Sequence, residues 1–215
     1  MVSSLLVLSK FLYLASATLT IGHLLLLLFF VRNKEGAIKE EFLYLRKRIS
    51  QFAWVWSIST IIFILATLAS ILDLPFSSAF DLTMLRSFLT QISLGKSLAL
   101  QTIGALVVAL WSSRVKKVSY GALILALSIV SISIPIFQSH SASGGSHLIA
   151  IGTLLIHVIA ITLWIGSLTA IVINRKIELH SVIARYSQLA LWAAISVVAS
   201  GAINAWIRLH LSNAW

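Results

Sequence analysis

Three of the six histidines stand close together in the second half of the chain and are candidate metal ligands. His140 and His147 lie in a segment of small residues, and His157 follows inside an apolar stretch. An imidazole held in hydrocarbon needs a partner or a ligand, and imidazole nitrogen suits copper, zinc and nickel. We therefore predict a metal uptake site in which His140 and His147 capture the ion outside the membrane and His157 receives it within.

Two other interpretations of these histidines stay open. The loop histidines could be solvated, with His157 a hydrogen-bonding residue between helices. Alternatively, His157 and His23, the other histidine within an apolar stretch, could hold a haem iron from two helices. Their predicted depths differ, because His157 lies about ten residues from the outer end of its stretch and His23 about eighteen. Two axial ligands of one iron should lie at a similar height, so this difference argues against a haem held by this pair.

Other chemistry has little support in the residues. The chain contains no Cys and only two Met, which excludes disulfides, thiolate metal sites and a thioether-rich copper channel. There is no nucleophile with an adjacent base, no glycine-rich phosphate loop and no HExxH motif. We predict that the chain is not an enzyme. The net charge of +10 comes from short basic clusters between apolar runs, a pattern that does not indicate nucleic-acid binding.

Six apolar stretches must position these residues. The chain is 59% hydrophobic and 10% charged, with a mean hydropathy of +1.01, and a hydrocarbon core of about 30 Å needs about 20 apolar residues per helix. We predict an all-α, polytopic transmembrane helix bundle that forms a single domain over residues 1–215. The predicted spans are Leu5–Val31, Ile49–Leu72, Ile92–Trp111, Val118–Phe137, His147–Ile173 and Ser187–Leu209.

The positions of Lys and Arg predict the orientation of the bundle. Basic residues concentrate in the loops after the first, third and fifth spans, and cytoplasmic loops are the ones enriched in Lys and Arg. Both termini are therefore predicted to be extracytoplasmic. The basic loop residues are Arg32, Lys34, Lys39, Arg46, Lys47 and Arg48, then Arg114, Lys116 and Lys117, then Arg175, Lys176 and Arg185; the opposite side has Lys10, Arg86 and Arg208, with Lys96 just inside the third span.

Two short motifs occur twice in the same order. Thr18-Leu-Thr-Ile-Gly22 matches Thr162-Leu-Trp-Ile-Gly166, and Arg48-Ile-Ser-Gln matches Arg185-Tyr-Ser-Gln. Matches at similar offsets predict tandem units of the same orientation. We expect the second unit to be incomplete, as in part of a longer protein. The predicted units cover about 1–137 and about 147–215.

Several polar and aromatic residues have more than one interpretation. Small and polar residues on one face of the sixth span predict helix packing, with pore lining as the alternative; they are Trp192, Ser196, Ser200 and Asn204. Residues of the predicted outer loop between the second and third spans could supplement a metal entry site, namely Asp73, Asp81, Met84 and Arg86, but Asp81 could equally cap a helix or pair with Arg86. Lys96, Ser97 and Gln101 form a polar patch. Tryptophans near span ends are predicted to anchor the interface; they are Trp54, Trp56, Trp111 and Trp206.

Four segments in this order resemble the copper resistance protein D (CopD) family, particularly its actinobacterial members. The similarity is clearest in spans three to six and looser in the first two. The sequence departs from the family pattern at Ser139, at Gly166-Ser167 and at Leu94-Gly95-Lys96. The four segments are Ser139-His-Ser-Ala-Ser-Gly-Gly-Ser-His147, Leu155-Ile-His-Val-Ile-Ala-Ile-Thr-Leu-Trp-Ile-Gly166, Arg185-Tyr-Ser-Gln188 and Ser200-Gly-Ala-Ile-Asn-Ala-Trp-Ile-Arg-Leu209.

The resemblance implies a multi-pass protein of the bacterial plasma membrane that transports or handles copper. The histidine positions of the family map onto His140, His147 and His157. Expected partners are the lipid bilayer, a periplasmic or extracellular copper chaperone and oxidase assembly components, with no nucleic acid. The alternatives are a haem-binding or quinone-linked redox subunit and a non-catalytic assembly factor for a respiratory complex.

Overall fold

The computed structural model describes residues 2–30, 38, 40–138, 147–174 and 179–212. The described residues form seven α-helices, and three short helical turns connect or extend them. The α-helices are α1 (Val2–Leu25), α2 (Tyr44–Ile71), α3 (Leu82–Gln91), α4 (Ser93–Ser112), α5 (Val118–Gln138), α6 (His147–Ile173) and α7 (Leu179–Ser212); the turns are Leu26–Phe30, Glu40–Phe42 and Phe76–Phe80.

Six of these helices are long and apolar enough to cross a membrane, which confirms the predicted all-α bundle of six spans. The fifth helix of this set, α6, has the bounds predicted from the sequence. By contrast, α2 begins at Tyr44 and α7 at Leu179, five and eight residues earlier than predicted. Both early starts lie in basic segments, where helical structure continues beyond the hydrophobic run.

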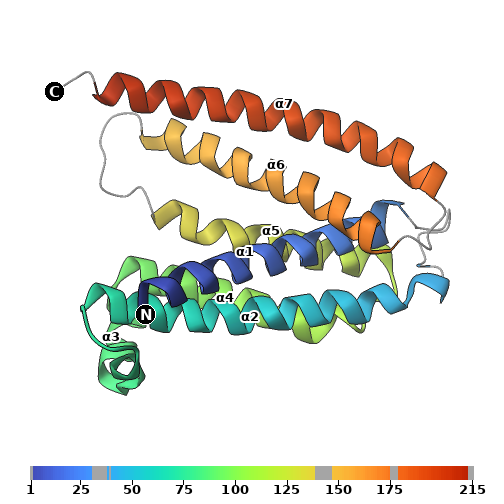
Figure 1. Cartoon of the computed structure of the whole chain (residues 1–215). Coiled ribbons are helices and arrows are strands. Elements are labelled where there is room, and N and C mark those ends of the chain that lie inside the picture. Colours follow the sequence, from blue (N-terminus) through green and yellow to red (C-terminus); the bar gives the residue numbers. More distant parts are fainter. Residues whose placement is uncertain (1, 31–37, 39, 139–146, 175–178, 213–215) are drawn as a thin grey trace.

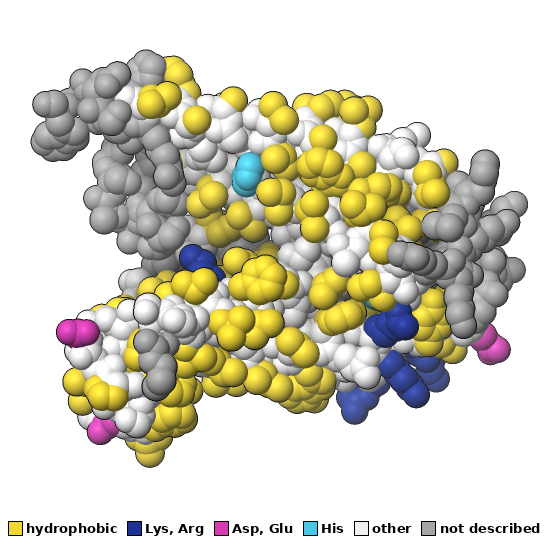
Figure 2. All heavy atoms as spheres, in the orientation of Figure 1, with side chains coloured by type: hydrophobic (Ala, Val, Ile, Leu, Met, Phe, Trp, Pro, Cys, Tyr) yellow, Lys and Arg dark blue, Asp and Glu magenta, His cyan; other side chains and the backbone are white. Residues whose placement is uncertain are grey.

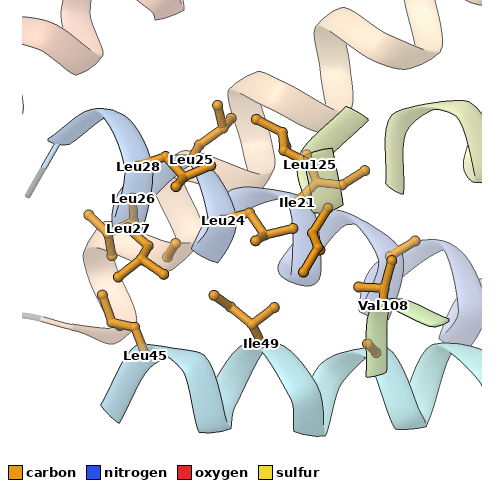
Figure 3. Packing of buried hydrophobic residues seen from close by; sticks show 14 of the residues in the cluster. Ile21, Leu24, Leu25, Leu26, Leu27, Leu28, Leu45, Ile49, Val108 and Leu125 are labelled. Atoms are coloured by element: carbon orange, nitrogen blue, oxygen red, sulfur yellow. The ribbon is translucent and has the colours of Figure 1, made fainter. Parts of the chain in front are cut away.

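The spans form a packed group and an attached hairpin (Figure 1). Helices α1, α2, α4 and α5 share one hydrophobic core, with Leu24, Ile49, Val108 and Leu125 among its members (Figure 3). Helix α6 packs on α1, and α7 packs mainly on α6. As a result, α6 and α7 are the least buried of the six spans.

The surface has the pattern expected of a membrane protein. In Figure 2, hydrophobic side chains cover most of the visible face, while Lys and Arg gather mainly at the end where α1 finishes and α2 begins. Apolar sides between polar ends are suited to lipid contact. The protein is therefore a multi-pass membrane protein, and the orientation of its termini remains a prediction.

At the basic end of the bundle, where α1 finishes and α2 begins, two arginines donate hydrogen bonds to backbone carbonyls of neighbouring segments. Arg46 donates to the carbonyl of Val115, just after α4, at 2.9 Å. Arg185 of α7 donates at 2.8 Å to the carbonyl of Phe29, in the last turn that follows α1. Carbonyls at helix C-termini lack partners within the helix and carry partial negative charge, so cations stabilise them. These arginines therefore contribute to packing between the helices.

The short helix α3 was not among the predicted elements. Asp81 caps it by accepting hydrogen bonds from the backbone N–H groups of Thr83 and Met84 at 2.8 and 3.0 Å, so the capping interpretation of Asp81 is confirmed. Phe88 of α3 is buried against the start of α4, where Gly95 leaves no space for a side chain. Figure 1 shows α3 end-on, lying across the direction of the spans.

One predicted membrane anchor is wrong. Trp54, Trp111 and Trp206 are exposed to the surroundings of the bundle, but Trp56 is fully buried. Successive helical residues are separated by about 100°, so Trp54 and Trp56 occupy nearly opposite faces of α2. The face that carries Trp56 points into the core of the bundle.

Candidate functional site

His157 lies between α6 and α7 and contacts Ser200. The imidazole Nδ1 is 3.1 Å from the Ser200 hydroxyl oxygen, and the ring is half-buried. The Ser200 hydroxyl is also 2.6 Å from the carbonyl of Ser196, one turn earlier in α7. A serine hydroxyl has one proton and two lone pairs.

The distances around Ser200 favour one tautomer of His157. The Ser196 carbonyl lies at 2.6 Å and is nearer to the Ser200 hydroxyl than Nδ1 is at 3.1 Å, so we assign the hydroxyl proton to the Ser196 carbonyl. The Ser200 oxygen then accepts from the Nδ1–H of His157. The lone pair of His157 is left on Nε2, and no residue in the described ranges hydrogen-bonds to that atom. His157 therefore has one nitrogen fixed by α7 and the other available.

A second polar contact joins α6 to α7 one turn further toward the start of α6. The Thr153 hydroxyl donates to the Asn204 side-chain oxygen at 2.8 Å. The packing interpretation of this face of α7 is confirmed for Ser200 and Asn204, because both contact α6. Trp192 does not share this role, since its side chain is 69% exposed.

The other two predicted ligands are less fully described. His140 lies outside the described residues, and His147 is described only as the first residue of α6. Ten residues of helix separate His147 from His157, which is about 15 Å along the axis. This separation exceeds the reach of two imidazoles bound to one ion. One ion therefore cannot be bound by both histidines. Within the ranges that the structure describes, no three His, Asp or Glu residues are grouped closely enough to hold a metal ion.

His23 occupies a different environment at the opposite end of the bundle. It is fully buried on α1 and its ring lies 4.9 Å from that of Phe52. Nδ1 donates to the Leu19 carbonyl at 2.8 Å, and Nε2 accepts from the Asn174 side-chain amide at 3.2 Å. Both ring nitrogens are occupied, so this arrangement leaves no nitrogen of His23 free for a haem iron.

Asn174 connects His23 to an arginine. Its side-chain oxygen accepts from Arg48 at 2.7 Å, while its amide also donates to the Ala170 carbonyl at 2.7 Å. The chain His23, Asn174, Arg48 thus links α1, α6 and α2 near the basic end. Sequence reasoning missed this network, because the residues stand up to 151 positions apart and Asn174 belongs to no recognisable motif.

The six apolar spans and the polar contacts within them define an integral membrane helix bundle. The sequence profile described as copper resistance protein D-like, N-terminal domain, matches residues 1–148. This match covers more than half of the chain, which therefore belongs to that family and is a copper-related membrane protein. The match includes His140 and His147 and ends before His157. No curated protein and no solved structure matches the chain.

Proposed function

We propose that this protein takes up copper from the extracytoplasmic side of the bacterial plasma membrane through successive histidine sites. His140 and His147 capture the ion outside, and His157 receives it within the bundle. The family membership supports copper as the ion. The observation that carries the proposal is the available Nε2 of His157, with Nδ1 hydrogen-bonded to Ser200 at 3.1 Å.

The environment of His157 suits a metal ligand. A histidine that binds a metal through one nitrogen generally donates the N–H of the other to a carboxylate, a carbonyl or water, which fixes the tautomer and the ring orientation. The Ser200 oxygen is such an acceptor, because the Ser200 hydroxyl donates its own proton to the Ser196 carbonyl.

The composition favours exchangeable binding. With no Cys and only two Met in the chain, the ligands are imidazoles, which bind Cu(I) less strongly than thiolates do. The separation of about 15 Å between His147 and His157 implies transfer from one site to the next. A copper chaperone outside the membrane and oxidase assembly components are the partners that this role implies, and we propose no catalytic step.

Copper titration of the purified protein tests the proposal. We expect the wild type to bind copper and the His140→Ala, His147→Ala, His157→Ala triple variant to lose that copper. The matched control is His180→Ala, which removes a histidine predicted to be cytoplasmic and should leave the stoichiometry unchanged. Equal copper stoichiometry in the wild type and the triple variant would contradict the proposal.

A further inference from the structure

Two fully buried polar side chains in the centre of the bundle have no hydrogen-bond partner among the described residues. They are Trp56 of α2, through its indole Nε1, and Gln101 of α4, through both amide atoms. Each side chain is 0% exposed. Buried polar groups in proteins are nearly always satisfied by protein atoms or by ordered water, and lipid offers no alternative partner. These three atoms therefore require an explanation.

The helix register places Trp56 and Gln101 at nearly the same depth. The Ser50 hydroxyl of α2 donates at 2.6 Å to the Ala109 carbonyl of α4, which aligns the two antiparallel helices. Trp56 is six residues beyond Ser50, about 9 Å along the axis, and Gln101 is eight residues before Ala109, about 12 Å in the same direction. Their heights differ by about 3 Å, near the middle of both spans.

Two hydroxyls at a similar height in the neighbouring helices already donate elsewhere. Thr60 donates to the Trp56 carbonyl at 2.8 Å. Thr20 of α1 lies at the height of Trp56, because the contact between the His23 and Phe52 rings aligns α1 with α2; it donates to the Ser16 carbonyl at 2.8 Å. Each hydroxyl has one proton, so neither of these two is available, and the acceptor oxygen of Gln101 has no partner among the described residues.

We propose that Trp56 and Gln101 form an internal binding site for water at the centre of the bundle. The indole N–H and the amide N–H groups donate, and the amide oxygen accepts. A water molecule that is both donor and acceptor matches this set, and buried waters typically make about three hydrogen bonds. Neither side chain is charged, so the site selects a small neutral molecule and not an ion.

A row of polar residues leads from this site toward the predicted outer end. Ser93, Ser97 and Gln101 are spaced by four residues and share one face of α4. Ser97 is buried, while Ser93 at the start of the helix is exposed. This row gives water a polar route into the group formed by α1, α2, α4 and α5. The site is separate from His157, which faces α7.

Proton NMR of the full chain in nanodiscs of deuterated lipid tests the inference, with ¹⁵N-labelled indoles and water itself as the probe. The Trp56→Phe variant identifies the Trp56 signal by its loss. We expect a cross-peak between the Trp56 indole proton and water, and its loss in Gln101→Leu. Trp111, which is exposed near a span end, provides a positive control.

Two results would overturn the water site. If the wild-type indole proton shows cross-peaks with the Gln101 amide and none with water, the two side chains satisfy each other directly. If the water cross-peak persists undiminished in Gln101→Leu, Gln101 is not part of the site. Once the Trp56 signal is assigned, the wild-type spectrum alone decides between direct pairing and bound water.

Discussion

Gly22 of α1 and Gly166 of α6 are in direct backbone contact, and a Cβ on Gly22 would collide with the carbonyl of Gly166. This contact joins the group formed by α1, α2, α4 and α5 to the α6–α7 hairpin. The two glycines end the matched motifs Thr18–Gly22 and Thr162–Gly166. The tandem repeat remains a prediction, but the residues that suggested it meet at the junction between the two parts.

We predict that Gly22→Ala destabilises the protein. The added methyl group has no space against the α6 backbone, and overpacking typically costs about 1–3 kcal/mol. Thermal unfolding in detergent measures the effect. The matched control is Gly152→Ala on α6, where a Cβ would meet nothing within 4 Å and the higher helix propensity of Ala should stabilise by up to about 1 kcal/mol. Equal unfolding temperatures for the two variants would contradict the close contact.

A second prediction concerns the Asn174 network. Asn174→Ala leaves both Arg48 and the buried Nε2 of His23 without their partner, and a lost hydrogen bond to a charged group costs about 1.5–3 kcal/mol. A double-mutant cycle with Arg48→Ala measures the coupling. Because both substitutions break the same 2.7 Å bond, the double variant should be less destabilised than the sum of the singles. Additive losses would show that Arg48 and Asn174 act independently.

A third prediction concerns Ser200. Ser200→Ala removes the acceptor for the Nδ1–H of His157, and loss of such an outer partner typically lowers metal affinity about 10–100-fold. Ser200→Thr keeps the hydroxyl and should restore binding. Copper titration and the ¹⁵N signals of the imidazole report affinity and tautomer separately. The control is Ser196→Ala, because among the described residues the Ser196 hydroxyl bonds only within its own helix, to the Trp192 carbonyl. Identical copper affinities in Ser200→Ala and wild type would exclude the positioning role.

The predicted orientation can be tested because the chain has no cysteine. Ser77→Cys places a thiol at an exposed position after α2, and Lys116→Cys places one at an exposed position after α4. A membrane-impermeant maleimide applied to intact cells should label only Ser77→Cys. After the cells are broken, both variants should react. Labelling of Lys116→Cys alone in intact cells would show that the protein has the opposite orientation in the membrane.

The sequence predicts the spans well because lipid imposes one condition on each of them. An apolar run of about 20 residues is sufficient to identify a span, and α6 begins and ends where predicted. The side-chain environment depends on rotation about the helix axis and on partners far away in sequence. Trp56 was misjudged for the first reason, and the bond between His23 and Asn174 was missed for the second. Similarly, α3 is short and less apolar than the spans, so hydropathy gave no signal for it.

For the candidate site, the types of residue could be interpreted from the sequence, but the geometry of their contacts could not. The polar face of α7 predicted packing, which the contacts of Ser200 and Asn204 confirm. The sequence could not indicate which nitrogen of His157 is available, because that depends on the hydroxyl proton of Ser200. The assignment of His140, His147 and His157 as copper ligands remains a prediction.

X-ray absorption at the copper edge tests the central claim most directly, because it detects imidazole ligands in either oxidation state of copper. The decisive sample is the His140→Ala, His147→Ala double variant, which isolates His157 and is loaded with copper after purification. We predict bound copper with imidazole scattering in this variant, and loss of that copper when His157→Ala is added. Equal bound copper in the double and triple variants, or no copper on the double variant, would contradict a copper site at His157.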